Sequence, residues 1–227
     1  MCGIFALFNN LKYSNGVIKM LFLEGKNRGP EDSQFHYLFQ HNIYLGFHRL
    51  AINGYHDEKA NQPFQINNIL LMCNGEIYNH KKLYEFLNIT PKSGSDCEVI
   101  IYCYEKYGIE YTLKLLDGVY AFVLVDLNKN KIFVARDLFG VRPLFLNTFI
   151  QTDNGETTIG YALGSELKNI DGFHELTNDI KQVKPGSLIT FSINDQQVVL
   201  ESQKQINQIR DFCNFTKEND CILKSVY

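Results

Sequence analysis

The second residue of the chain is a cysteine, and its position gives that thiol an unusual chemical setting. Cys2 follows Met1 directly and begins the apolar run Gly3-Ile4-Phe5. Initiator methionine is normally removed before a small residue, and its removal would leave Cys2 with a thiol and a free α-amino group. An α-amino group titrates at about 7.7–8.0 and is suited to act as the general base for the thiol. These residues alone leave two interpretations open: a self-contained nucleophile, or a small buried residue of a strand.

The other chemistry-bearing residues form no recognisable metal or phosphate motif. The six cysteines, at positions 2, 73, 97, 103, 213 and 221, include no CxxC pair, and the six histidines are scattered. This pattern predicts reduced thiols and no metal site. Glycine-rich phosphate loops are also missing from the sequence. We therefore expect no cofactor in this chain.

The composition is that of an ordinary globular protein. The 227 residues are 45% hydrophobic, and the net charge is −3 with basic and acidic residues interspersed. No basic run favours nucleic acid, no apolar run reaches the roughly 20 residues of a membrane span, and the first residues lack the features of a signal peptide. The sequence thus predicts a cytoplasmic protein without nucleic-acid or membrane partners.

The elements that must position Cys2 follow from the hydrophobic pattern. Residues 2–8 form a continuous apolar run, which predicts a strand buried on both faces. Further strands are expected at 34–39, 43–50, 69–73, 118–127, 131–136, 144–149, 157–163, 187–192 and 197–201, and helices at 16–27, 81–87, 96–107 and 110–116. Residues 53–68 are expected to form a long polar loop, and Ser95 or Asp96 to cap the helix that follows. Many strands with a few central helices predict an α+β fold with sheets packed face to face and helices outside.

The chain is expected to hold one domain. No repeat or low-complexity linker divides residues 1–202. Residues 203–227 are polar, with a helix-start pattern at Thr216-Lys217-Glu218. This stretch is interpreted as a tail or as the start of a linker to a further domain.

A series of short motifs resembles one family. They are Met1-Cys2-Gly3-Ile4-Phe5, Arg28-Gly29-Pro30, Gly46-Phe47-His48-Arg49-Leu50-Ala51-Ile52, Gln62-Pro63, Asn74-Gly75-Glu76-Ile77-Tyr78-Asn79, Ser95-Asp96-Cys97-Glu98, Leu116-Asp117-Gly118, Ala135-Arg136-Asp137 with Gly140-Val141-Arg142-Pro143-Leu144, and Ser165-Glu166-Leu167-Lys168. In this order they resemble the class II glutamine amidotransferases, N-terminal-nucleophile (Ntn) hydrolases, and especially the glutaminase half of glutamine-dependent asparagine synthetase.

The resemblance implies a four-layer αββα sandwich of two antiparallel sheets. It implies that Cys2, after loss of Met1, attacks the side-chain amide of L-glutamine, and that Asn74 and Gly75 form the oxyanion hole. Arg49 would bind the α-carboxylate, a role that suits a planar guanidinium, and Asp96 the α-ammonium. Leu50, Ala51, Ile52, Asn53 and Glu76 would line the substrate site.

Each residue also has a simpler interpretation, and the acceptor of the ammonia stays open. Taken singly, Asn74-Gly75 is typical of a turn, Arg49 of a surface ion pair and Asp96 of a helix cap. The family's His-Arg-Gly-Pro-Asp loop is altered here to Asn27-Arg28-Gly29-Pro30-Glu31, which puts the closure of that loop in question.

The chain also lacks the pyrophosphate-binding Ser-Gly-Gly-x-Asp-Ser pattern, so ATP and Mg would be needed only by a separate synthetase domain or chain. The alternatives are a glutaminase that serves a sugar phosphate or phosphoribosyl acceptor, and a non-catalytic glutamine-binding module. A homodimer is also left open.

Overall fold

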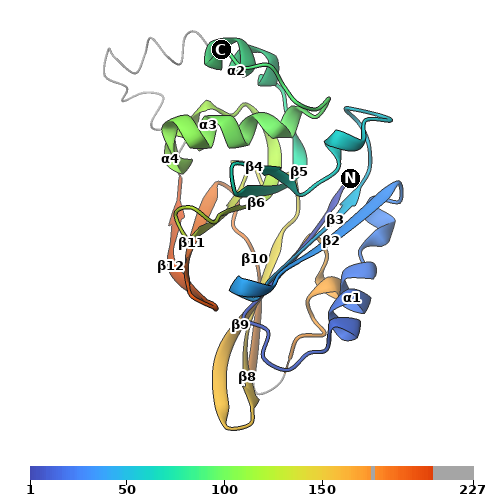
Figure 1. Ribbon diagram of the computed structural model, residues 1–227, viewed down its shortest axis with the longest axis vertical. Coiled ribbons are helices and arrows are strands. Elements are labelled where there is room, and N and C mark those ends of the chain that lie inside the picture. The colour runs from blue at the N-terminus through green and yellow to red at the C-terminus, as the bar shows by residue number, and fades with distance from the viewer. Residues whose placement is uncertain (175–176, 207–227) are drawn as a thin grey trace.

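The computed structural model describes residues 1–174 and 177–206, which build two six-stranded sheets (Figure 1). The first sheet has the order β10-β8-β9-β1-β3-β2, and the second β12-β11-β7-β6-β5-β4. Neighbouring strands pair antiparallel throughout. The strands are β1 Gly3–Phe8, β2 Asp32–Leu38, β3 Ile43–Arg49, β4 Phe64–Ile66, β5 Ile69–Ile77, β6 Gly118–Asp126, β7 Lys131–Arg136, β8 Phe145–Asp153, β9 Glu156–Gly164, β10 Thr177–Gln182, β11 Ser187–Asn194 and β12 Gln197–Gln205.

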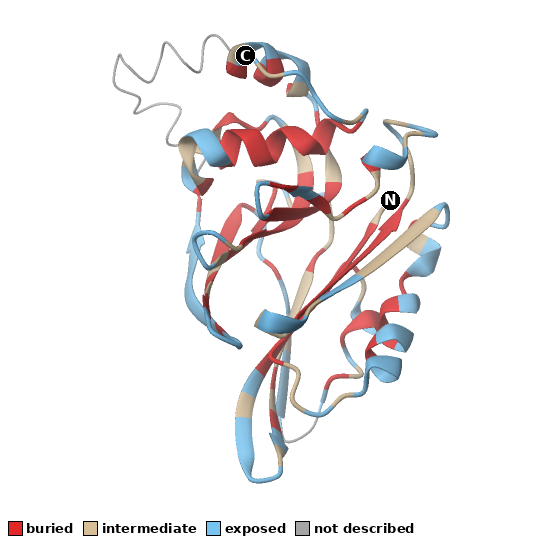
Figure 2. Cartoon of the chain, viewed as in Figure 1, coloured by how far each residue is buried: buried red, intermediate tan, exposed pale blue. Residues whose placement is uncertain are grey.

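Helices cover the outer faces of both sheets. The helix α1 (Asn15–Leu23) packs on the first sheet, while α2 (His80–Leu87), α3 (Val99–Tyr107) and α4 (Ile109–Leu115) pack on the second. The buried side chains accordingly form three clusters, one between the two sheets and one under each helical layer. Figure 2 shows the buried residues concentrated on the strands and on α3. The predicted four-layer αββα sandwich is confirmed.

The first strand occupies the middle of its sheet. Strand β1 lies between β3 and β9, and all its residues are buried. Ile4 faces the second sheet, whereas Phe5 faces α1. This explains why the strand is apolar on both faces, as expected from the sequence. Gly3 pairs with His48 of β3, so Cys2 is placed beside the end of β3.

Some elements differ from the sequence-based expectations. Strand β5 continues past Cys73 to Ile77, and the loop expected at 53–68 contains the 3₁₀ turn η3 (Glu58–Ala60) and the strand β4. Strand β10 was not expected. Helix α1 ends at Leu23, earlier than residue 27, and the 3₁₀ turn η1 (Lys26–Arg28) follows it after Gly25. The final strand β12 runs through residue 202 to Gln205.

The domain boundary near residue 202 stays a prediction, and the helix expected after Thr216 lies outside the described residues. Among residues 1–174 and 177–206, no helix has the length and apolar character needed to cross a membrane. The cytoplasmic location stays a prediction.

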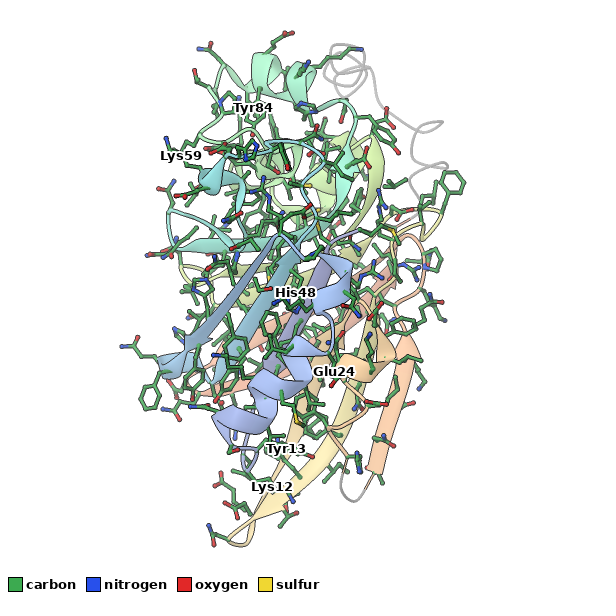
Figure 3. All side chains as sticks on the ribbon, turned by 90° about the vertical axis from the view of Figure 1, so that its right-hand side faces the viewer. Lys12, Tyr13, Glu24, His48, Lys59 and Tyr84 are labelled. Carbon is green, nitrogen blue, oxygen red and sulfur yellow. The ribbon has the colours of Figure 1, made fainter. Side chains whose placement is uncertain are left out.

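A buried histidine joins α1 to the sheet beneath it. The His48 ring, labelled in Figure 3, stacks on Phe22 with a centroid distance of 4.0 Å. Its Nε2 lies 2.9 Å from the Phe22 carbonyl oxygen, and its Nδ1 lies 2.7 Å from Ser33 Oγ. The carbonyl can only accept, so Nε2 carries the proton and Nδ1 accepts from the Ser33 hydroxyl. Burial lowers the pKa of His48.

We expect this histidine to make folding sensitive to mild acid. The folded state disfavours the protonated ring, so stability is unaffected above the unfolded pKa near 6.5 and falls as pH drops below it. The loss should reach at most about 1.4 kcal/mol per pH unit. Urea unfolding between pH 7.5 and pH 5 should show a weaker pH dependence in His48→Gln than in wild type. His36→Gln changes an exposed histidine and should keep the wild-type slope; equal slopes in all three proteins would contradict the assignment.

Candidate active site

Cys2 lies where the first strand meets the end of β3. The Leu50 N–H points to Cys2 Sγ at 3.4 Å, and the thiol points to the Leu50 carbonyl oxygen at 3.5 Å. Arg28 Nε donates to the Cys2 carbonyl oxygen at 2.9 Å. These contacts hold the main chain and the sulfur of Cys2 on the edge of a cavity. Burial raises the pKa of the Cys2 thiol, while the nearby amino terminus and Arg49 lower it.

Asn74 and Gly75 lie within strand β5 and do not form the turn that the pair alone would favour. Gly75 pairs with Tyr120 of β6, and a Cβ on Gly75 would come within 2.4 Å of the Val119 carbonyl oxygen. Only glycine fits this close approach. The side chain of Asn74 is buried, and its Nδ2 has no hydrogen-bond partner. A buried amide donor without a partner is costly, so a ligand that accepts from it would be favoured.

Asp96 is held rigidly at the start of the 3₁₀ turn η4 (Asp96–Glu98). Its Oδ2 accepts from the Ile77 N–H at 2.6 Å, and its Oδ1 accepts from Asn53 Nδ2 at 3.0 Å. Of the two residues predicted as the cap, Ser95 takes that place, since its hydroxyl accepts from the Cys97 N–H. Asp96 therefore links η4 to both β5 and the loop after β3, a position that a cap residue alone would not require.

Arg49 is buried, and its guanidinium already holds the loop that follows β3. Nη1 donates to the Asp57 carbonyl oxygen at 2.9 Å and to Asn61 Oδ1 at 2.7 Å. Nη2 donates to the carbonyl oxygens of Gly54 at 2.5 Å and Asn53 at 3.4 Å. Within residues 1–174 and 177–206, Arg49 is buried and forms these contacts in place of the surface ion pair considered from the sequence. The guanidinium could bind a carboxylate in a bidentate manner only if it gave up some of these hydrogen bonds to the loop.

One cavity of about 40 Å³ collects every residue that the sequence nominated. These residues are Cys2, Arg49, Leu50, Ala51, Ile52, Asn53, Asn74, Gly75, Glu76 and Asp96. They come from both sheets and from two loops, so only the assembled sandwich brings them together. The space holds a few waters.

The structure adds three positioning residues that the sequence reasoning quoted in motifs but did not assign. Arg28 holds the Cys2 carbonyl. Gln62 brackets Cys73, because its Oε1 accepts from the Cys73 N–H at 2.6 Å and its Nε2 donates to the Cys73 carbonyl oxygen at 3.3 Å. Arg142 Nη2 donates to Glu76 Oε1 at 3.0 Å. Their presence in the motifs was the one sign in the sequence that they matter. No rule based on sequence spacing could have predicted that Arg142 contacts Glu76.

The altered loop before β2 also touches the site. Glu31 Oε2 accepts from the Ala51 N–H at 3.0 Å, so the residue that departs from the family pattern reaches the predicted substrate segment. Gly29 makes this approach possible, since a Cβ there would lie 2.4 Å from the His48 carbonyl oxygen. Across residues 1–174 and 177–206, no group of three or more His, Cys, Asp or Glu side chains could hold a metal ion.

Comparison with protein families gives one match over most of the chain. The profile of a family described as "Glutamine amidotransferase domain" matches residues 1–220. The match covers both sheets and every residue that lines the cavity.

Similar proteins point the same way. A probable glutamine-hydrolyzing asparagine synthetase of Acanthamoeba polyphaga mimivirus is 34% identical over 220 residues, which are 95% of this chain and 38% of that protein. The glutamine-hydrolyzing asparagine synthetase of Pongo abelii is 36% identical over 192 residues, or 82% of this chain and 32% of that protein. The chain thus spans about a third of the length of these relatives.

A solved structure shares the fold. Glutamine phosphoribosylpyrophosphate amidotransferase from B. subtilis matches with a TM-score of 0.67 and 21% identity, over 91% of this chain and 49% of that chain. This likeness supports the arrangement of the layers and carries no argument about a substrate.

Proposed function

The chain belongs to the glutamine amidotransferase domain family, and from this premise we propose that it hydrolyses the side-chain amide of L-glutamine at Cys2. Removal of Met1 exposes the α-amino group of Cys2, which takes the thiol proton. The sulfur attacks the amide carbon, and the amino group returns the proton to the departing ammonia. Water then cleaves the thioester to give glutamate and the free thiol.

The developing oxyanion is stabilised by Asn74 and Gly75. Asn74 Nδ2 is a buried donor without a partner. It can therefore donate to the substrate oxygen as negative charge develops there, without first breaking another hydrogen bond. The Gly75 N–H is the second donor. Burial raises the pKa of Cys2, so the neighbouring amine is what makes the thiol nucleophilic near neutral pH.

The substrate's charged end is bound by Arg49, Asp96 and Glu76. Arg49 exchanges part of its contacts with the loop at 53–61 for the α-carboxylate, and this opens the cavity to an amino acid. Asp96 and Glu76 receive the α-ammonium. The segment that lines the site and shifts when glutamine binds is Leu50, Ala51, Ile52 and Asn53.

The ammonia serves asparagine synthesis from aspartate, by a synthetase domain or chain that would itself require ATP and Mg²⁺. The support is the likeness to asparagine synthetases of several organisms. A homodimer is compatible with this proposal but has no observation that favours it.

The observation that carries the proposal is the convergence of all ten nominated residues on one cavity that holds an unpartnered amide donor. The test is the intact mass of the purified protein before and after incubation with a glutamine-like diazoketone that alkylates N-terminal cysteines, together with an assay of glutamate release. We expect a chain without Met1, one adduct on Cys2, and glutamate formation. A retained Met1 with neither adduct nor glutamate would overturn the proposal.

We expect Arg142→Gln to raise the KM for glutamine by about three- to tenfold with a smaller change in kcat. Arg142 holds Glu76 through one partly exposed ion pair, and its loss would let the carboxylate leave the ammonium site. Steady-state kinetics measures this split.

The matched control is Lys131→Gln, which removes a partly exposed ion pair with Glu201 outside the cavity and should leave KM unchanged. An unchanged KM in Arg142→Gln, or an equal rise in the control, would contradict the positioning role.

A further inference from the structure

The beginning of strand β1 is held partly by side chains on the side that faces β9. Main-chain pairing of these two strands starts at Phe5, which lies opposite Gly164. At the preceding residue, the Ile4 N–H donates to Ser165 Oγ at 2.9 Å, and the Ile4 carbonyl oxygen accepts from the Ser165 N–H at 3.0 Å. Ser165 is buried. Its hydroxyl thus takes the place of the carbonyl that a regular antiparallel ladder would present to Ile4.

Two residues before Ile4, the carbonyl of Cys2 is held by an arginine that is itself anchored. Arg28 Nε donates to the Cys2 carbonyl oxygen at 2.9 Å, and Arg28 Nη1 lies 3.5 Å from Glu166 Oε1. The side chain of Arg28 is 10% exposed and that of Glu166 is 30% exposed, so water screens this ion pair less than a pair at the open surface. Glu166 follows Ser165 in the chain. Two neighbouring residues at the end of β9 therefore hold the first residues of β1.

Cys2 needs such anchoring because the proposed mechanism makes it the chain terminus. Once Met1 is removed, no residue on the amino side of Cys2 restrains it, and chain termini are poorly ordered unless they are tied down. The hydrogen bond from Arg28 fixes the peptide plane between Cys2 and Gly3, and the contacts of Sγ with Leu50 fix the thiol relative to that plane. The directions of the α-amino group and of the thiol therefore depend on how firmly Arg28 is held.

We propose that Ser165 and Glu166 are positioning residues for the nucleophile, an inference that rests on the proposed glutaminase activity of Cys2. Ser165 fixes the main chain of Ile4. Glu166 fixes the guanidinium of Arg28, which in turn orients the Cys2 carbonyl. Neither positioning residue lines the cavity. Their loss should therefore lower kcat more than it raises KM, because a displaced thiol attacks slowly while the residues that bind glutamine stay in place.

The main test is Glu166→Gln, which keeps the shape of the side chain and removes its charge. We expect kcat for glutamine hydrolysis to fall by about three- to tenfold with little change in KM. Steady-state kinetics measures this split. The matched control is Glu201→Gln, which changes a glutamate of similar exposure that pairs with Lys131 outside the cavity and should keep the wild-type kcat. An unchanged kcat in Glu166→Gln, or an equal fall in the control, would overturn the role of Glu166.

A double-mutant cycle tests whether Glu166 acts through Arg28. In the Arg28→Gln background, Glu166→Gln should lower kcat by less than about twofold, because its connection to Cys2 is already broken. The same fold-change in both backgrounds would contradict this connection.

Ser165→Ala tests the second positioning residue by removing the acceptor of the Ile4 N–H. We expect kcat to fall by about tenfold with a smaller change in KM. The kcat is expressed per Cys2 that the glutamine-like diazoketone alkylates, so that unfolded chains do not count. An unchanged kcat on this basis would overturn the role of Ser165.

Two alkylating reagents distinguish a displaced thiol from a protein that is damaged as a whole. The diazoketone needs an oriented thiol, whereas iodoacetamide does not. In Glu166→Gln, alkylation measured on the Cys2 peptide should become slower with the diazoketone. It should become faster with iodoacetamide, because the thiol is held less firmly against Leu50. An iodoacetamide rate that does not rise would overturn the positioning role.

The iodoacetamide rate also separates this inference from the proposed function. A wild-type chain that releases no glutamate would defeat the proposed function. In that chain, faster reaction of Cys2 with iodoacetamide in Glu166→Gln than in wild type would still support the anchoring by Glu166, and an equal rate would overturn it.

Discussion

Replacing Cys2 with alanine is expected to lower glutamine hydrolysis by at least about 10³-fold, because it removes the nucleophile that forms the thioester in the proposed mechanism. Asn74, Arg49 and Asp96 stay in place in this variant, so glutamine binding should survive. Glutamate release measures the first effect, and isothermal titration with glutamine measures the second. The diazoketone adduct should disappear from the mass spectrum.

Two controls separate the nucleophile from a general thiol effect. Cys103→Ala removes a buried thiol outside the cavity and should keep activity. A lysine inserted between Met1 and Cys2 keeps the thiol. A large second residue blocks methionine removal, so the nitrogen of Cys2 stays in a peptide bond and cannot act as a base. This insertion should be almost as inactive as Cys2→Ala. Full activity in it would show that the α-amino group is not the base.

Replacing Asn74 with alanine is expected to lower kcat by about 10²–10³-fold, the usual cost of removing one oxyanion donor. The KM for glutamine should change little, because the donor acts on charge that develops in the transition state. Stability should also change little. The variant loses side-chain packing but removes a buried amide nitrogen that has no partner in the folded chain.

Asn79→Ala is the matched control, since Asn79 is a buried asparagine outside the cavity with both ends paired. Its Nδ2 donates to the Leu115 carbonyl oxygen, and its Oδ1 accepts from the Asp117 N–H. This variant should lose stability by about 1–3 kcal/mol while keeping kcat. Thermal unfolding and steady-state kinetics on both variants test whether Asn74→Ala loses kcat but not stability and Asn79→Ala loses stability but not kcat. A large stability loss in Asn74→Ala with unchanged kcat would contradict the donor role.

The central layers could be predicted from local pattern because burial dictates residue type there. Strand β1 is apolar on both faces because one face packs against the second sheet and the other against α1, and this is visible in the seven consecutive residues 2–8. Strand β10 could not be found in this way. It is an edge strand with the polar sequence Thr-Asn-Asp-Ile-Lys-Gln, mostly exposed, so neither face carries an apolar signal.

The sequence nominated residues that line one cavity, but it did not give their geometry, and their roles stay predictions. Motif order nominated ten of the residues that line the cavity, yet Asn74-Gly75 is locally typical of a turn, and only the pairing with β6 places it within a strand. The hydrogen bonds of Arg49 could not be predicted either. Most of its acceptors are main-chain carbonyls, which every residue carries, so the sequence gives no sign of which ones it contacts. Arg142 meets Glu76 only because two distant segments converge on the same edge.

The central place of β1 has a consequence for the order of events during synthesis on the ribosome. Its neighbours are β3 and β9, and β9 (Glu156–Gly164) is made long after β1. The first strand therefore waits for its second partner until most of the chain has emerged, and pairings so distant in sequence form slowly. If Met1 is removed, as the proposed mechanism requires, that interval is when the amino terminus is most accessible, before the cavity around the thiol has closed.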